Sequence, residues 1–449
     1  MRTYGWTFRH TAAPDQHPPD SDALPSWKTK MPNSLSHIRL TRAALALQPW
    51  ALPDTDRFIN DYCLYPDEYL SPRWREIAPY CPMVDNVPFH YLPDTPWDTL
   101  YRYWRMDADG SSRCIPFDNP NFRWAQAGFR QCISHAVSAF HAGQNDEAFR
   151  FLGVLLHVLQ DATFGIHALE GAGGADLTIL DRLLDAPVLP SELLANLQWE
   201  ETMLLDYQPH SLGTTQDEAV MRLYAIYCQT ASVARKHCVQ YVQRALAGRK
   251  DDLTPLVRDM GEATIRLCAD VLYTVHQLAG NERDAQPDPL RLETLEAFEY
   301  PFGGFGPFRF RPPTRDCVPD AAGGKPLPLQ LGAIRYSHGL AFGSHREGRL
   351  LYWIAPGVFQ SLTARIGLHP AFASKGVVDV TLVNNGQEVA TLSLDHDHSE
   401  APIMLSEPGD VTGLSFRSTP GCGVIVLASP ELHRKVIPRE ETASVPERR

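Results

Sequence analysis

The chain has 449 residues, a formal net charge of −12, 44% hydrophobic residues and 21% charged residues. This length exceeds what one hydrophobic core usually supports, so we expect two domains. The acidic balance argues against binding of duplex nucleic acid or of an anionic membrane surface, which needs clustered Lys and Arg. No stretch approaches the roughly 18 apolar residues of a membrane span, and the N-terminus lacks the apolar region of a secretory signal. We therefore expect no integral membrane segment and a cytoplasmic location.

The nine cysteines are scattered through the chain and form no C-x-x-C pair. Their number is odd, and several lie in apolar helical patterns. This pattern favours buried, reduced thiols over a disulfide framework.

The first two-thirds of the chain predict an all-α domain, residues 31–282, after a flexible Pro-rich arm at residues 1–30. Between Trp50 and Phe122 the sequence is dense in Pro, Asp, Tyr and Trp, and it predicts a long irregular stretch. Apolar residues elsewhere recur at helical spacing. The expected helices span residues 34–47, 123–143, 145–163, 216–247 and 253–279.

The last third has a different character. Residues 283–326 are rich in Pro, Gly and Phe and are expected to be a linker. Short alternating runs separated by turn signals follow, and they predict a β-sandwich over residues 327–432. The segment Asn384-Asn385-Gly386 between two such runs is typical of a β-hairpin. The charged tail, residues 433–449, is expected to be disordered.

One polar constellation interrupts the apolar pattern of the helix over residues 145–163. His157 and Asp161 are four positions apart, so both lie on one helix face within reach of one cation, and His167 follows six residues later. Imidazole and carboxylate are ligands that suit zinc. The His157–Asp161 pair taken alone fits equally well a hydrogen-bonded pair in a helical core.

The surrounding sequence adds a family resemblance. The segment LGVLLHVLQDATFGIH, with AFRFLG overlapping its start, resembles the central helix of the zinc-dependent phospholipases C and the related single-strand nucleases, with its pattern H-x3-D-x5-H. The segment NSLSHIRLTRAALAL resembles the first helix of that superfamily and places His37 at a zinc-binding histidine. Upstream of the central helix, PFHYLPDT offers His90, and DYCLYPDEY offers Asp67 for the family's aspartate, with Asp61 as second choice.

This resemblance implies a cluster of two zinc ions, or three. Asp67, His90, His157 and Asp161 would hold one zinc, and Asp161 would bridge to a neighbour that also takes His37. By the same resemblance Asp67 would be the catalytic base beside the bridging Asp161.

A further zinc would be anchored by His167, but the family's His-x3-Glu downstream of this residue is absent. Glu170 and Asp176 are the expected replacements, with Asp181 and Asp185 as alternatives. The family also uses its mature N-terminal Trp as a ligand, whereas Trp27 is internal here. Only processing before Trp27 would supply that ligand, and such processing would speak against the cytoplasmic location.

Residues 328–430 resemble the carbohydrate-binding module family NPCBM. The matching pieces are Gly339, Gly343 and His345, then Phe359 and the segment ARIGLH, and then the hairpin. This resemblance implies a galactose-binding-like jelly roll with a glycan ligand. His369 replaces the family's aspartate, which puts ligand or ion binding at that turn in question.

Three functions follow as hypotheses. The first is a zinc-dependent phosphodiester hydrolase, most like a phospholipase C acting on a phospholipid headgroup or similar substrate, with an accessory glycan- or partner-binding module. The second is a phosphodiesterase of the single-strand nuclease type. The third is a carbohydrate-binding protein whose metal site is structural or degenerate.

Overall fold

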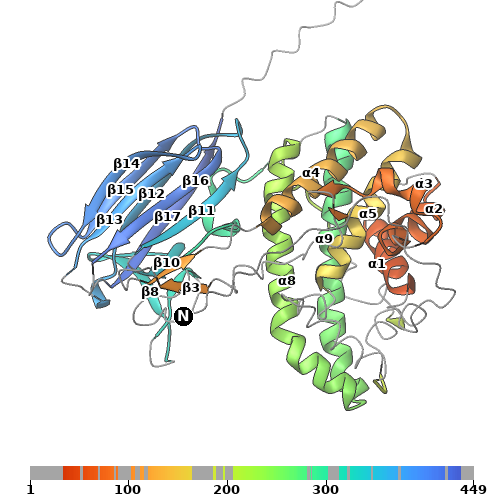
Figure 1. Cartoon of the computed structure of the whole chain (residues 1–449), viewed down its shortest axis with the longest axis horizontal. Coiled ribbons are helices and arrows are strands. Elements are labelled where there is room, and N and C mark those ends of the chain that lie inside the picture. The colour runs from red at the N-terminus through yellow and green to blue at the C-terminus, as the bar shows by residue number, and fades with distance from the viewer. Residues whose placement is uncertain are drawn as a thin grey trace, which may run out of the picture.

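The computed structural model shows a helical region followed by a β-sandwich (Figure 1). This order confirms the fold class expected from the sequence. The structure describes residues 34–50, 54–68, 71–84, 87–88, 103–106, 112–115, 120–163, 186–188, 196–197, 206–280, 284, 286–301, 313–320, 324–344, 347–372, 376–419 and 423–435. The expected N-terminal arm lies outside these residues.

Five longer helices build the helical region, and each corresponds to a predicted one. Their apolar residues recur at helical spacing, which gives each helix a face to bury. They are α1 (Ser34–Ala46), α4 (Pro120–His141), α5 (Asn145–Thr163), α8 (Gln216–Leu246) and α9 (Lys250–Gly280).

Part of the stretch that was expected to be irregular forms short helices and hairpins, so that prediction was wrong for these residues. Pro66 and Pro79 lie within or at the start of short 3-10 helices, where they limit the length of any regular element. The elements are α2 (Asp56–Asn60), η1 (Tyr62–Glu68), α3 (Trp74–Ile77), η2 (Ala78–Tyr80), β1 (Met83–Val84), β2 (Val87–Pro88), β3 (Tyr103–Met106) and β4 (Ser112–Ile115).

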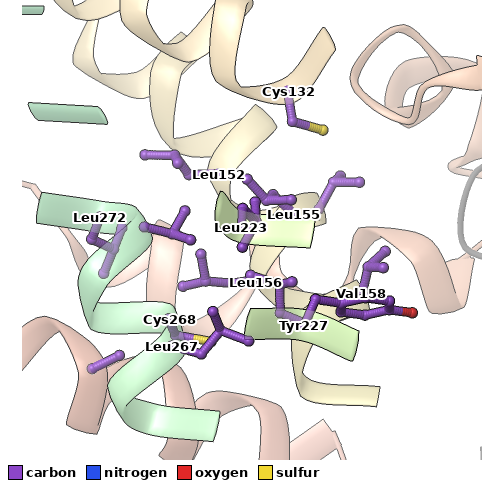
Figure 2. Packing of buried hydrophobic residues seen from close by; sticks show 14 of the residues in the cluster. Cys132, Leu152, Leu155, Leu156, Val158, Leu223, Tyr227, Leu267, Cys268 and Leu272 are labelled. Carbon is purple, nitrogen blue, oxygen red and sulfur yellow. The ribbon is translucent and has the colours of Figure 1, made fainter. Parts of the chain in front are cut away.

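Helix α5 lies at the centre of the helical core. Every residue from Phe151 to Gln160 is buried. Figure 2 shows Leu152, Leu155 and Leu156 of this helix within the same hydrophobic cluster as residues of α4, α8 and α9. A polar side chain on such a helix must find partners inside the protein, because an unsatisfied buried polar group is costly.

The sandwich consists of two principal antiparallel sheets with a smaller sheet beside them. The first has the order β15-β12-β17-β10-β6, with β5 also paired to β17, and the second has the order β11-β16-β13-β14. The strands of the second sheet are β11 (Glu347–Ile354), β13 (Val378–Asn384), β14 (Gln387–Leu394) and β16 (Asp410–Ser418). The principal strands of the first are β10 (Gly339–Gly343), β12 (Phe359–Leu368), β15 (Glu400–Ser406) and β17 (Val424–Arg434).

The predicted hairpin is confirmed in register. Asn384 pairs with Gln387, so Asn385 and Gly386 form a two-residue turn. Both turn residues have positive φ, 50° and 74°. This is the conformation that a hairpin with the native strand twist requires, and it explains the Asn-Gly pair.

Parts of the expected linker are hydrogen-bonded into the sandwich. Strand β5 (Leu290–Arg291) pairs with β17, and β6 (Thr314–Arg315) pairs with β10. β7 (Cys317–Val318) pairs with β8 (Leu327–Leu331), which in turn pairs with β9 (Ile334–Tyr336) to form the smaller sheet. At the other end, β17 continues to Arg434, past the expected end of the sandwich at residue 432.

The helical region and the sandwich are in contact through α8. Met221 and Ala225 of this helix belong to the hydrophobic core of the sandwich. Beside them, the Nη1 atom of Arg434 on β17 donates to Oε2 of the fully buried Glu218 over 3.1 Å. The contact thus combines apolar burial with a shielded ion pair.

Two expectations about the chain as a whole can be compared with the described residues. Cys63, Cys81, Cys132, Cys228 and Cys268 are buried, as predicted, and Cys317 is partly exposed. Among the helices that the structure describes, we find none with the length and apolar character to cross a membrane.

Candidate metal centre

His157 presents one ring nitrogen to two carboxylates and has the other fixed by the backbone. Its Nδ1 atom lies 2.7 Å from the carbonyl oxygen of Cys63 in η1. Because a carbonyl can only accept, Nδ1 carries the proton and Nε2 keeps its lone pair when the ring is neutral. Such a hydrogen bond on the rear nitrogen is the usual way in which a protein orients a metal-binding histidine.

His37 on α1 is held in the same manner. Its Nδ1 atom lies 2.8 Å from Oε1 of Gln160, whose Nε2 donates to Oγ1 of Thr41 over 2.9 Å. The imidazole rings of His37 and His157 stack, with centroids 4.1 Å apart and planes inclined by 12°. Helices α1 and α5 therefore present two parallel imidazoles side by side.

Two carboxylates face the Nε2 atoms of these rings. From Nε2 of His157, Oδ2 of Asp161 lies 3.3 Å away and Oδ1 of Asp67 lies 3.6 Å away. Nε2 of His37 lies 3.6 Å from Oδ1 of Asp161. Two ligands at about 2.0–2.1 Å from a tetrahedral zinc ion are about 3.3–3.4 Å apart, whereas a direct N–H···O bond is usually about 2.9–3.0 Å. The spacing is close to that of ligands around one cation.

Ligand atoms of His37, Asp67 and His157 all lie within 4.8 Å of one another, an arrangement able to hold a metal ion. Two imidazoles with carboxylates form a donor set that zinc accepts, and the fixed Nδ1 atoms leave the correct nitrogens available. The residues therefore fit the metal that the sequence implies.

The electrostatics of the two histidines differ. Burial and the neighbouring His157 lower the pKa of His37, which favours the neutral, ligating form. For His157, burial alone would lower the pKa, but the charges of Asp161 and Asp67, together with the hydrogen bonds to Asp161 and to the Cys63 carbonyl, raise the pKa to about 9. The carboxylates thus attract positive charge to this position, which a divalent cation supplies as well as a proton does.

Exposure separates the two carboxylates. The side chain of Asp161 is 16% exposed and that of Asp67 is 47% exposed, while the His157 side chain is 2% exposed. The cluster is closed on the imidazole side and accessible to solvent at Asp67. A site of this kind offers access to a substrate, unlike a fully enclosed structural site.

The structure brings together four of the residues selected from the sequence, namely His37, Asp67, His157 and Asp161. Asp61, the second choice for Asp67, is not part of this cluster and instead pairs with Arg73 at 2.9 Å. The expected division of ligands between neighbouring zinc ions stays a prediction. The other selected residues lie outside the described part of the chain: His90, His167, Glu170, Asp176, Asp181 and Asp185.

Sequence reasoning missed the groups that orient the histidines. Gln160 adjoins Asp161 in a buried apolar run, and a polar residue there is a signal that it has a partner. The Cys63 carbonyl has no sequence signal, because a backbone acceptor is independent of the side chain. Its role depends on where η1 lies.

In the sandwich, His369 is occupied by hydrogen bonds within the fold. Its Nε2 lies 3.0 Å from the Pro328 carbonyl, and its Nδ1 accepts from the amide of Ala371 over 3.2 Å. Burial lowers its pKa. Both ring nitrogens therefore stabilise the turn after β12, and His345 lies outside the described residues.

Comparison with known proteins gives distant matches to solved structures only. No protein-family model and no curated protein matches the sequence. A structure search matches alpha toxin from Clostridium absonum at 9% identity, covering 90% of this chain and 94% of that one, with a TM-score of 0.30. It also matches the CBM51 module of a Clostridium perfringens GH95 protein in complex with methyl-galactose at 14% identity, covering 32% of this chain and 99% of the module, with a TM-score of 0.24.

A third match is the M60 catalytic domain with CBM51 domains of Clostridium perfringens ZmpB, at 13% identity and a TM-score of 0.26. It covers 32% of this chain, and this chain spans only 15% of that one. We therefore base the function on the residues of the site.

Proposed function

We propose that this chain is a metal-dependent phosphodiester hydrolase, most like a zinc-dependent phospholipase C. The observation that carries the proposal is the cluster of two imidazoles and two carboxylates. The Nδ1 atom of each imidazole is hydrogen-bonded within the fold. The Nε2 atoms lie 3.3–3.6 Å from carboxylate oxygens, and the cluster is open to solvent at Asp67. Zinc bound there would supply a Lewis acid for a phosphate oxygen and would lower the pKa of a coordinated water.

The residues of the chain have separate tasks in this proposal. His157 and His37 hold the cation through Nε2, while the Cys63 carbonyl and Gln160 keep the rings in that orientation. Asp161 contacts both histidines and balances the cation's charge. Asp67, the most exposed of the four, is placed to accept a proton from an attacking water at its carboxylate oxygen.

A purified full-length chain tests this proposal through its metal content and its hydrolysis of bis-p-nitrophenyl phosphate. We expect at least one zinc ion per chain, and loss of both zinc and hydrolysis in Asp161→Ala. Phosphatidylcholine and single-stranded DNA then separate the phospholipase C reading from the nuclease one. A dialysed protein without zinc, whose hydrolysis is unchanged in Asp161→Ala, would contradict the proposal.

For the sandwich we propose a glycan-binding role that accompanies the hydrolase. Its support is the NPCBM-like pattern of residues 328–430 together with the observed two-sheet architecture. A glycan array probed with the full-length chain is expected to show saturable binding that survives Asp161→Ala. Absence of binding to every sugar on the array would leave the sandwich as a protein-docking or structural module.

A further inference from the structure

Gly153 lies on α5, one helical turn before His157, and the chain of η1 passes directly over it. A Cβ atom built on Gly153 would lie 2.5 Å from the carbonyl carbon of Tyr62, 2.6 Å from its oxygen and 2.8 Å from its Cβ. Such distances are well inside van der Waals contact, and two of the three atoms belong to the backbone. An alanine at position 153 therefore fits only if η1 moves.

Glycine in a helix interior is unfavourable compared with alanine, so its presence in a buried helix calls for a reason in the packing. The reason here is the close approach of η1. Tyr62 is further fixed on α5 by Asp146, which accepts from its hydroxyl, and by Arg150, whose guanidinium lies 5.2 Å from the ring centroid.

Two parts of the candidate metal centre are carried by η1. The carbonyl of Cys63, the residue next to Tyr62, accepts from Nδ1 of His157, and Asp67 faces Nε2 of the same ring. The remaining groups come from elsewhere, since His37 belongs to α1 and Asp161 to α5. A change in the separation between η1 and α5 would therefore move the Cys63 carbonyl and Asp67, and would leave His37 and Asp161 where they are.

We propose that Gly153 is a positioning residue, which lets η1 approach α5 closely enough to place the Cys63 carbonyl and Asp67 on His157. The metal part of this inference rests on the proposed function, but the steric part does not. Moving η1 outward would withdraw Asp67 as a ligand and free the rear nitrogen of His157, while His37 and Asp161 stay in place.

The variant Gly153→Ala tests this role in the full-length chain. We expect its zinc affinity, measured by chelator competition, to fall by about 10–100-fold, the usual cost of losing groups that orient a metal ligand. With cobalt in place of zinc, we expect the visible absorption spectrum of Gly153→Ala to resemble that of Asp67→Ala. Adding Asp67→Ala to Gly153→Ala should then lower the affinity little further, because the ligand has already been withdrawn.

Val158→Ala is the matched control, since it removes buried atoms from the same helix and adds none beside η1. It should leave zinc affinity and the cobalt spectrum unchanged. Wild-type affinity and spectrum in Gly153→Ala, or a full additive effect of Asp67→Ala in its background, would overturn the proposal.

Amide exchange without metal separates this inference from the proposed function. Residues 62–68 should exchange faster in Gly153→Ala than in Val158→Ala, even if the wild-type chain binds no zinc. That combination would reject the proposed function and keep the steric part, whereas equal exchange in both variants would reject the steric part.

If Gly153→Ala fails to fold, Asp146→Ala loosens Tyr62 from α5 without adding an atom. Its zinc affinity should fall several-fold, and an unchanged affinity would overturn the role of η1.

Discussion

The Nε2 atom of His157 lies 3.3 Å from Oδ2 of Asp161, one turn further along α5. Both side chains project from a helix whose residues 151–160 are all buried. With Nδ1 of His157 already donating to the Cys63 carbonyl, the remaining nitrogen and the carboxylate face a common point. A hydrogen-bonded pair in a helical core would need no further partners. Here His37 and Asp67 also bring ligand atoms close to His157, as expected for a metal site.

Zinc should stabilise the helical region, because the folded state holds the ligands together and the unfolded chain does not. At a free zinc concentration of 100 times Kd, the expected gain is about 2.7 kcal/mol of unfolding free energy. Thermal unfolding with zinc and with a chelator checks this gain. His157→Ala should remove it, and a zinc-dependent shift of equal size in that variant would contradict the assignment.

Gln160 orients His37, so its removal should weaken metal binding without removing a ligand. We expect Gln160→Leu to lower zinc affinity by about 10–100-fold, since the Nδ1 hydrogen bond is lost. Thr41→Val removes the next contact, to the side-chain amide of Gln160, together with a hydrogen bond to the Cys63 thiol, and should have a smaller effect. Chelator competition on both variants gives the order, and equal affinity in Gln160→Leu and wild type would show that His37 needs no such support.

The longer elements could be predicted from the sequence because each has an apolar face of its own. The five long helices and the strands of the second sheet have regular spacing over many residues, and the Asn385-Gly386 turn has its own chemistry. Strands β5 and β6 have only two residues each, and they form through pairing with β17 and β10 far along the chain. No local pattern predicts such pairing.

The same distinction applies to the site. The spacing of His157 and Asp161 is local to one helix, and His37 was selected by resemblance to a first helix. Geometry distinguishes Asp67 from Asp61 only once η1 is placed, because Asp61 turns to Arg73 while Asp67 faces His157. The position of η1 is set by tertiary contacts with Gly153 and Asp146, which no single segment reveals.

The buried thiols should resist alkylation in the folded protein. Burial raises the pKa of Cys63 and of Cys81 from 9.0 to about 12, so almost no thiolate exists at pH 8. We expect iodoacetamide to modify both residues only after unfolding, whereas the partly exposed Cys317 should react earlier. Peptide mass spectrometry after timed alkylation measures the order, and rapid native labelling of Cys63 would contradict its burial.

The same pKa shifts have a consequence for stability at high pH. Below pH 9 these thiols are protonated in both states, so their ionisation contributes nothing to the pH dependence. Between pH 9 and about 12 the unfolded chain loses these protons and the folded chain retains them. The unfolding free energy should therefore fall as the pH rises through this window, and replacing Cys63 and Cys81 by Ala should reduce the slope.

Arg434 links the last strand of the sandwich to the first turn of α8 through Glu218. The two side chains are 14% and 0% exposed, so removing Arg434 leaves the buried Glu218 carboxylate without its hydrogen-bonded counterion. We expect Arg434→Met to lower the unfolding free energy by about 3–5 kcal/mol.

The neighbouring Lys435 pairs with Glu407 at 3.0 Å, but these side chains are 38% and 74% exposed. Lys435→Met should therefore cost no more than about 1 kcal/mol. Urea unfolding followed by circular dichroism compares the two variants, and similar small losses in both would show that the Arg434–Glu218 pair does not hold the two regions together.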